Sequence, residues 1–166
     1  MGDEVEQGRA VDQAWLGEAV MEMRANGRPG DTMREFNDAL VAEYRSSGGT
    51  SMGTFPIHKI GILTMKGAKT GQERVVPVGF EEIDGRILVI ATQGGMPTHP
   101  NWYHNLVADP NVTVEFKGET WPAQAVELDA DDRAEVFSKL EGNFKTYETM
   151  IAGARHIPVF DLQRQG

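Results

Sequence analysis

The sequence predicts an α+β fold in which a small antiparallel β-barrel carries flanking helices. Two segments with helical periodicity precede the first strand-like segment, and six or so short apolar segments follow them. Tight hairpin signals join several of these apolar segments, which favours antiparallel pairing. A further helical segment separates the two halves of the strand-rich region, and another lies near the C-terminus.

Residues 1–50 are expected to form a helical extension of two amphipathic helices. In the first, apolar residues recur every fourth position over residues 11–23, and Asn26-Gly27 ends the run. The second begins with a predicted capping box of Thr32 and Glu35, in which each side chain satisfies the other's backbone N–H. The Gly/Ser-rich segment 46–53 ends this helix and marks the boundary to a barrel domain over residues 51–166.

The barrel domain contains strand-length apolar segments joined by glycine turns. The expected strands cover residues 60–65, 75–83, 86–91, 112–116, 119–128 and 157–160. Asp84-Gly85 is the strongest hairpin signal, because a type I′ turn needs positive φ at both central positions. A helix is expected from His99 to Ala108 with Pro100 in its first turn, and another from Asp129 to Met150.

Composition excludes several classes of function. The formal net charge of −9 argues against nucleic-acid binding and against electrostatic attachment to anionic lipid. The chain has no cysteine, which excludes disulfides and thiolate metal sites, and its histidines lack metal-ligand spacing, so no metal is expected. No segment approaches the ~20 apolar residues of a membrane span, and the acidic N-terminus lacks a signal-peptide core. We therefore expect a cytoplasmic protein without stable membrane insertion.

The first candidate ligand site is the basic loop of residues 66–74, K-G-A-K-T-G-Q-E-R. Its two glycines allow backbone N–H groups to face outward, Thr70 adds a hydroxyl, and Lys69 and Arg74 add positive charge. Such a loop suits a phosphate or carboxylate ligand. The same pattern is also typical of an ordinary solvated hairpin loop.

The second candidate site covers residues 91–105, where a strand runs into Gly94-Gly95 and then into a helix N-terminus. Exposed N–H groups at such a terminus bind anions or polar ring edges. Trp102 and Tyr103 are suited to wall a planar ligand. The alternative is that the glycines only form a turn and that Trp102 fills the core.

The two motifs together resemble the deazaflavin-dependent nitroreductase family. The sequence K-G-A-K-T-G-Q-x-R is followed about twenty residues later by G-G-x-x-x-x-P-N-W-Y-x-N-L-x-A-x-P, and the resemblance continues from residue 36 to residue 158. That family comprises flavin and deazaflavin oxidoreductases with a split β-barrel fold. The resemblance implies a split barrel that binds coenzyme F-420.

Carried over position by position, the resemblance assigns residues to the cofactor. The implied cofactor-binding residues are Lys66, Lys69, Thr70, Gly71, Arg74, Pro77, Val78, Ala91, Thr92, Gln93, Gly94, Gly95, Pro100, Asn101, Trp102 and Asn105. Lys69, Thr70, Gly71 and Arg74 are implied to surround the phosphate and glutamyl tail, the strand residues to line the deazaflavin ring, and the helix residues to close the pocket. The implied acceptor-side residues are Gly79, Phe80, Phe144 and Tyr147, with Tyr147 as a proton donor.

Two positions depart from the family pattern. Members often carry Arg where this chain has Ala68, and Lys where it has Gln93, so two anion contacts are missing and Lys66 is expected to replace one. Nitroimidazole-reducing members carry a tyrosine where this chain has Gly79. The nitroreductase activity is therefore not transferred with the resemblance.

The predicted function is hydride transfer from reduced coenzyme F-420 to a small electron-poor acceptor, which is a quinone, an activated enone or a nitroaromatic. One alternative is an FMN-dependent reductase on the same barrel. Another is a non-catalytic binder of lipid or another apolar ligand. The protein is expected to act as a monomer or a homodimer.

Overall fold

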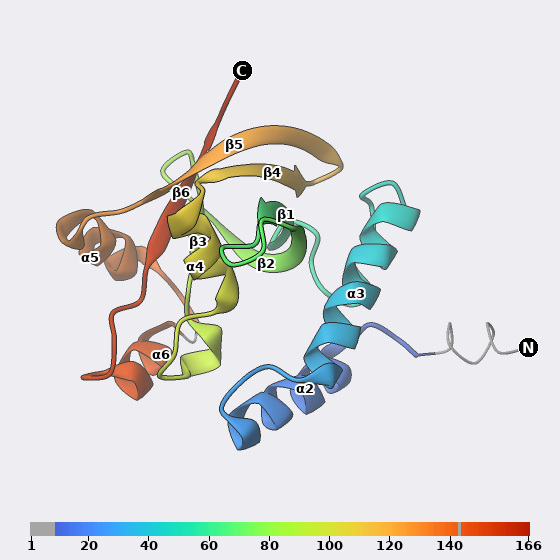
Figure 1. Ribbon diagram of the computed structural model, residues 1–166, viewed down its shortest axis with the longest axis horizontal. Coiled ribbons are helices and arrows are strands. Elements are labelled where there is room, and N and C mark those ends of the chain that lie inside the picture. The colour runs from blue at the N-terminus through green and yellow to red at the C-terminus, as the bar shows by residue number, and fades with distance from the viewer. Residues whose placement is uncertain (1–8, 143) are drawn as a thin grey trace, which may run out of the picture.

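The computed structural model describes residues 9–142 and 144–166 and forms a closed antiparallel barrel with helices around it (Figure 1). Neighbouring strands follow the order β1-β2-β3-β6-β5-β4, and β1 pairs with β4 to close the ring. The strands are β1 Ile60–Lys66, β2 Glu73–Ile83, β3 Arg86–Ile90, β4 Asn111–Phe116, β5 Glu119–Glu127 and β6 Val159–Arg164. The predicted fold class is confirmed.

Helices pack around the outside of the barrel. Those described are α2 Gln13–Asn26, α3 Asp31–Ser46, the short 3₁₀ helix η1 Gln93–Gly95, α4 Asn101–Ala108, α5 Ala130–Lys139 and α6 Phe144–Ile151. Helices α2 and α3 form an antiparallel pair on one side of the barrel, and α5 and α6 lie on the other (Figure 1). None of the helices in the described part of the chain combines the length and hydrophobicity that a bilayer crossing requires.

Strand β2 changes partner along its length. Residues 73–79 pair with β1, whereas Phe80–Ile83 pair with β3. No other described strand pairs with residues 73–79, so the edge of this segment that faces away from β1 is open. Because the backbone N–H and C=O groups of a strand alternate between its two edges, about half of those in this segment lack a strand partner.

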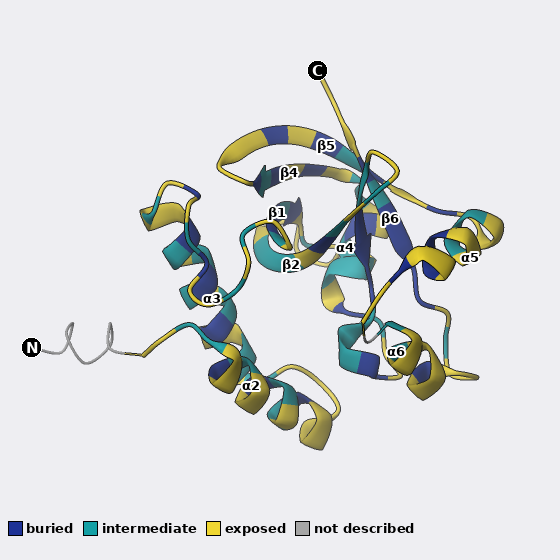
Figure 2. Cartoon of the chain, turned by 180° about the vertical axis from the view of Figure 1, so that it is seen from behind, coloured by how far each residue is buried: buried dark blue, intermediate teal, exposed yellow. Residues whose placement is uncertain are grey.

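The barrel interior is filled by large side chains that alternate inward along the strands (dark blue in Figure 2). Phe80 and Phe116 pack there with ring centroids 4.9 Å apart. Gly61 makes room for them, because a Cβ at this position would lie 2.2 Å from the Phe80 ring. A second apolar cluster lies beneath α5 and α6, around Leu88 and Ile151.

The two N-terminal helices share a third apolar cluster with the barrel. Trp15, Phe36, Leu40 and Tyr44 pack with Ile62 of β1. The Tyr44 hydroxyl accepts a 3.0 Å hydrogen bond from the N–H of Gly118, in the turn between β4 and β5. Helix α3 is thus anchored on the barrel, and the domain boundary near residue 50 stays a prediction.

Three local predictions were wrong. Thr32 does not form a capping box with Glu35; its hydroxyl and its N–H both donate to the Glu22 carboxylate of α2, and Gly30 is the N-cap. Pro100 is the N-cap of α4 and lies outside its first turn. The helix expected over residues 129–150 is broken into α5 and α6: α5 ends at Lys139, Leu140 is extended with a ψ of 144°, and Gly142 follows with a left-handed φ of 79°.

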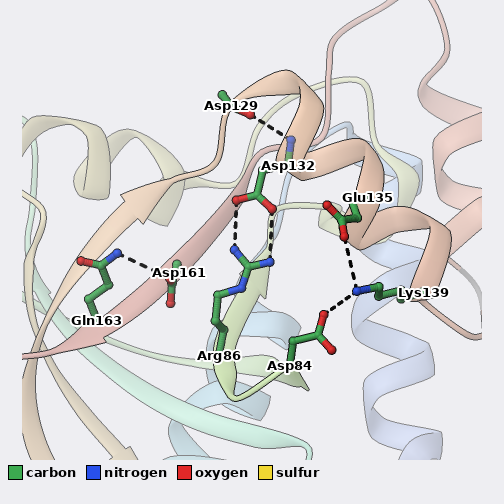
Figure 3. A network of polar contacts seen from close by, with 8 residues as sticks. All are labelled: Asp84, Arg86, Asp129, Asp132, Glu135, Lys139, Asp161 and Gln163. Atoms are coloured by element: carbon green, nitrogen blue, oxygen red, sulfur yellow. Dashed lines mark hydrogen bonds and ion pairs between the residues drawn. The ribbon is translucent and has the colours of Figure 1, made fainter.

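Helix α5 is fastened to the β2–β3 hairpin by paired charges (Figure 3). Asp132 accepts two hydrogen bonds from Arg86, at 3.0 and 3.2 Å, and Lys139 pairs with Asp84 in the hairpin turn. Asp129 caps the helix by accepting a 2.9 Å hydrogen bond from the N–H of Asp132. Asp129 and Asp132, at the N-terminus of this helix, therefore have structural roles.

Candidate functional site

A cleft of about 1220 Å³ lies between the open segment of β2 and the helix pair α2–α3. On the barrel side its lining includes residues 67–70 of the basic loop, residues 74–79 of β2, and several residues of α4. On the opposite side it is lined by α2, α3 and the connection between them. Both sequence motifs therefore contribute to one site.

The basic loop between β1 and β2 uses three of its backbone N–H groups for hydrogen bonds within the loop. Gly67 donates to Gln72 O at 2.7 Å, Gly71 donates to Gly67 O at 2.8 Å, and Gln72 donates to Thr70 Oγ1 at 3.2 Å. Among the described residues, the loop N–H groups of Lys69 and Thr70 have no acceptor. The sequence predicted several outward-facing backbone N–H groups in this loop, and these two are the ones that remain available to a ligand.

The loop also concentrates positive charge that forms no ion pair in the described part of the chain. Lys69 and Arg74 line the cleft, Lys66 lies at the end of β1, and none of the three has an ion pair within residues 9–142 and 144–166. A Cβ added to Gly67 would lie 3.1 Å from Thr70 Oγ1 and 3.3 Å from Arg74 Nε. The absence of a side chain at Gly67 thus allows a hydroxyl and a guanidinium to converge, as an anion site requires.

Six consecutive residues of β2, Arg74 to Gly79, line the cleft beside this charge. They belong to the segment with the open edge, so their unpaired backbone groups are available to a ligand. Val76, Pro77 and Val78 add a half-buried apolar surface. The cleft thus has positive charge at one end and a flat apolar edge with backbone polar groups at the other. This arrangement suits a ligand that consists of a heteroaromatic ring and an anionic tail.

Helix α4 connects the two motifs directly. The Asn105 side chain accepts a 2.9 Å hydrogen bond from the N–H of Ala68 in the basic loop. Trp102 lines the cleft and also packs edge-on against Phe160 of β6, with ring centroids 6.3 Å apart. The sequence left open whether Trp102 lines a ligand site or fills the core, and in the structure it does both.

The turn at η1 closes one end of the cleft. Gln93 has a φ of 44°, and its side-chain amide donates to Thr98 O at 3.1 Å and to Thr98 Oγ1 at 2.9 Å. A Cβ on Gly95 would lie 2.9 Å from Met150 Sδ and 3.1 Å from the Tyr147 ring. The close approach at Gly95 therefore brings Tyr147 of α6 to the cleft, which it lines.

The remaining expected site residues lie away from the cleft lining. Phe80 is 1% exposed in the barrel core, and Phe144 packs against the cluster under α5 and α6. The others outside the lining are Lys66, Gly71, Ala91, Thr92 and Gly95. Both loops singled out by the sequence pattern therefore reach the cleft, but the pattern did not show which of their residues line it.

Two contributions were missed. Arg155 donates to the carbonyl oxygens of Ala91, Thr92 and Met96 at 2.9–3.2 Å, and thereby fixes the chain around η1. No local pattern marks this arginine, because its partners lie about sixty residues away. The second is the set of residues that α2 and α3 contribute to the cleft. Their amphipathic faces indicated that the helices cover another surface, but did not show which residues would line a site.

His99 lies behind η1, against Arg155 Nη1 at 3.2 Å. Burial, together with the positive charge of Arg155, lowers the pKa of His99 from 6.5 to about 4. The imidazole is thus neutral at neutral pH and accepts from the arginine. The described residues contain no group of three or more His, Cys, Asp or Glu side chains able to hold a metal ion.

Comparison with known proteins gives consistent results. A family model described as F-420H(2)-dependent quinone reductase matches residues 33–164. The F-420H(2)-dependent quinone reductase of Mycobacterium tuberculosis (strain ATCC 25618 / H37Rv) is 30% identical over 110 residues, which cover 63% of this chain and 72% of the relative.

Two solved structures are similar in fold and in sequence. That of an F-420H(2)-dependent reductase (FDR-A) has a TM-score of 0.56 and 33% identity, covering 63% of this chain and 94% of that one. Another, described as a domain-swapped dimer, has a TM-score of 0.59 and 31% identity, covering 74% and 91%. The predictions of a split barrel and of an F-420-dependent oxidoreductase are confirmed, and this chain belongs to the F-420H(2)-dependent quinone reductase family.

Proposed function

We propose that the cleft holds coenzyme F-420 with its phosphate at Lys69, Thr70 and Arg74 and its ring along the open edge of β2. When bound, the reduced cofactor supplies a hydride. The observation that carries the proposal is that Lys69 and Arg74, which have no ion pair among the described residues, lie in one cleft with six consecutive residues of β2. Trp102 and Asn105 are the residues we assign to closing the site from α4.

The protein contributes binding, orientation and exclusion of water rather than a nucleophile. Backbone groups along residues 74–79 fix the edge of a planar ring, and the apolar walls of the cleft keep water from the reacting surface. We assign the Tyr147 hydroxyl as the proton donor to the reduced acceptor, because it is half-buried and lines the cleft. The proposed acceptor is a quinone, with an activated enone or a nitroaromatic as further substrates.

Fluorescence titration with F-420, alongside FMN, tests the cofactor assignment. Saturable quenching by F-420 is expected, with weaker or no binding of FMN. Lys69→Ala removes one charge-assisted contact and is expected to weaken F-420 binding about tenfold. Lys145→Ala is the matched control, because Lys145 is exposed and lies outside the cleft. Equal affinities of the two variants would contradict the assignment.

Replacement of Tyr147 by Phe tests the proton donor. The variant is expected to bind F-420 normally and to lose about 10²-fold in kcat for menadione reduction. Its rate should also lose the solvent isotope effect that protonation by the hydroxyl imposes. An unchanged kcat would show that solvent delivers the proton.

A further inference from the structure

The wall of the cleft opposite β2 is apolar at every position but one. It is built by α2, α3 and the connection between them, which contribute Leu16, Val20, Met23, Pro29, Met33, Phe36, Asn37 and Leu40. None of these residues carries a charge, whereas the opposite end of the cleft contains Lys69 and Arg74. The charged end of the cleft and this apolar wall therefore suit different parts of the bound molecules. The wall does not suit the anionic tail of a cofactor.

Asn37 is the exception in this wall. It lies four residues after Met33 and three before Leu40, so all three share one face of α3. Its side chain is half-buried, and no hydrogen bond from it is found within the described residues. A primary amide held against apolar neighbours loses part of its hydration, and this loss is offset only when a partner arrives.

The chemistry of the amide limits what this partner can be. The NH₂ group of Asn37 donates to a carbonyl oxygen, and its own carbonyl accepts from a hydroxyl, so it pairs with both a ketone and the corresponding alcohol or phenol. The surrounding aliphatic and aromatic side chains favour a flat apolar molecule. A conjugated cyclic ketone with a hydrocarbon substituent satisfies both requirements.

We propose that α2 and α3 form the acceptor half of the cleft and that Asn37 is its specificity-determining residue. Asn37 donates to a carbonyl oxygen of a planar conjugated diketone, and the hydrocarbon substituent of that acceptor packs on Leu16, Val20 and Met33. This assignment rests on the proposed function, because it presupposes that the opposite wall of the cleft is used by the cofactor.

The test measures binding of two ring systems of similar shape, menadione and methylnaphthalene, to the purified protein without cofactor. Only menadione carries carbonyl groups, so the ratio of the two dissociation constants reports the polar contact. Asn37→Leu is expected to weaken menadione binding about tenfold and to leave methylnaphthalene binding unchanged. Asn37→Gln should retain part of the preference, because it keeps the amide.

Asp38→Leu is the matched control, since Asp38 is the exposed neighbour on α3 and does not line the cleft. Leucine is a good helix former, so both variants should fold, and equal Tm values would verify this. The inference is wrong if Asn37→Leu keeps the preference for menadione, or if wild-type protein binds both ring systems equally or not at all.

Parallel F-420 titrations separate this result from the proposed function. Asn37→Leu should bind F-420 as the wild type does. If wild-type protein binds menadione through Asn37 but binds no F-420, the cofactor proposal fails while the amide contact stands. If F-420 binds and the menadione preference is insensitive to Asn37, the acceptor assignment alone fails.

Discussion

The Arg24 guanidinium donates a 3.0 Å hydrogen bond to the carbonyl oxygen of Gly94, which joins α2 to η1 across one end of the cleft. The side chain of Met23 lies beside the same glycine, because a Cβ there would be 3.1 Å from Met23 Cε. Helix α3 is held on the barrel by Tyr44, whereas α2 contacts the η1 turn through this pair. The Arg24–Gly94 contact is therefore expected to hold α2 over the bound ligand.

Replacing Arg24 by Ala should shorten the residence time of F-420. The contact is solvent-exposed and is worth about 1 kcal/mol, which corresponds to a rise of about fivefold in the dissociation rate. Stopped-flow displacement of F-420 measures this rate. Arg28→Ala is the control, since Arg28 is exposed and its side chain has no hydrogen bond or ion pair within residues 9–142 and 144–166. The two variants must differ in dissociation rate for the interpretation to hold.

A methyl group on Gly67 should impair the anion site specifically. In Gly67→Ala the new Cβ approaches Thr70 Oγ1 and Arg74 Nε, at 3.1 and 3.3 Å, so one of these groups must move. We expect F-420 to bind about tenfold more weakly while Tm stays close to that of the wild type. Gly17→Ala has open space around its Cβ and should leave binding unchanged. Similar binding by both variants would exclude convergence of these groups on the ligand.

An arginine at position 68 should strengthen cofactor binding. Ala68 is exposed and lines the cleft, and its backbone N–H, which donates to Asn105, is preserved in any substitution except proline. Ala68→Arg is expected to lower the dissociation constant for F-420 severalfold at low salt, with the gain shrinking as ionic strength rises. Ala68→Gln controls for side-chain length. A gain that persists at high salt would point to packing rather than charge.

Arg155 is expected to matter for stability more than its surface-loop position suggests. Lysine cannot reproduce a guanidinium that donates to the carbonyl oxygens of four residues, so Arg155→Lys should lower the free energy of unfolding by about 2 kcal/mol. Urea denaturation measures the change. Arg133→Lys should have little effect, because the Arg133 side chain forms no hydrogen bond in the described part of the chain; equal losses of stability would refute the role of Arg155.

His99 should make stability fall in mildly acidic solution. Its pKa is about 4 in the folded protein and 6.5 as the ordinary value, so the unfolded chain binds the extra proton between these values. The stabilising contribution of neutral His99 is complete above pH 6.5 and is lost as the pH falls towards 4. Urea denaturation at several pH values should show a shallower decline for His99→Gln than for wild type. Parallel curves would rule out His99 as the titrating group.

Local sequence signals predicted the barrel well. Asp84-Gly85 and Lys117-Gly118 adopt positive φ at all four positions, as their hairpin turns require. Residues of both sequence motifs line the cleft, and each motif stood out because it combines glycines with charged or aromatic residues within a few positions. The predictions that were wrong or missing concern contacts between residues distant in sequence. Glu22 accepts the hydrogen bonds of Thr32 in place of the expected capping box, and Arg155 fixes a turn about sixty residues earlier. Short-range patterns do not encode such contacts.

The open edge of β2 has a consequence for solubility. An unpaired strand edge is a template onto which a strand of another molecule can add, and such addition leads to aggregation. Pro77 lies in the middle of this segment and has no N–H, so it interrupts the row of donors that an incoming strand would need. Pro77, which contributes to the flat surface of the cleft, thereby also protects the ligand-free protein from strand pairing with another molecule of the same protein.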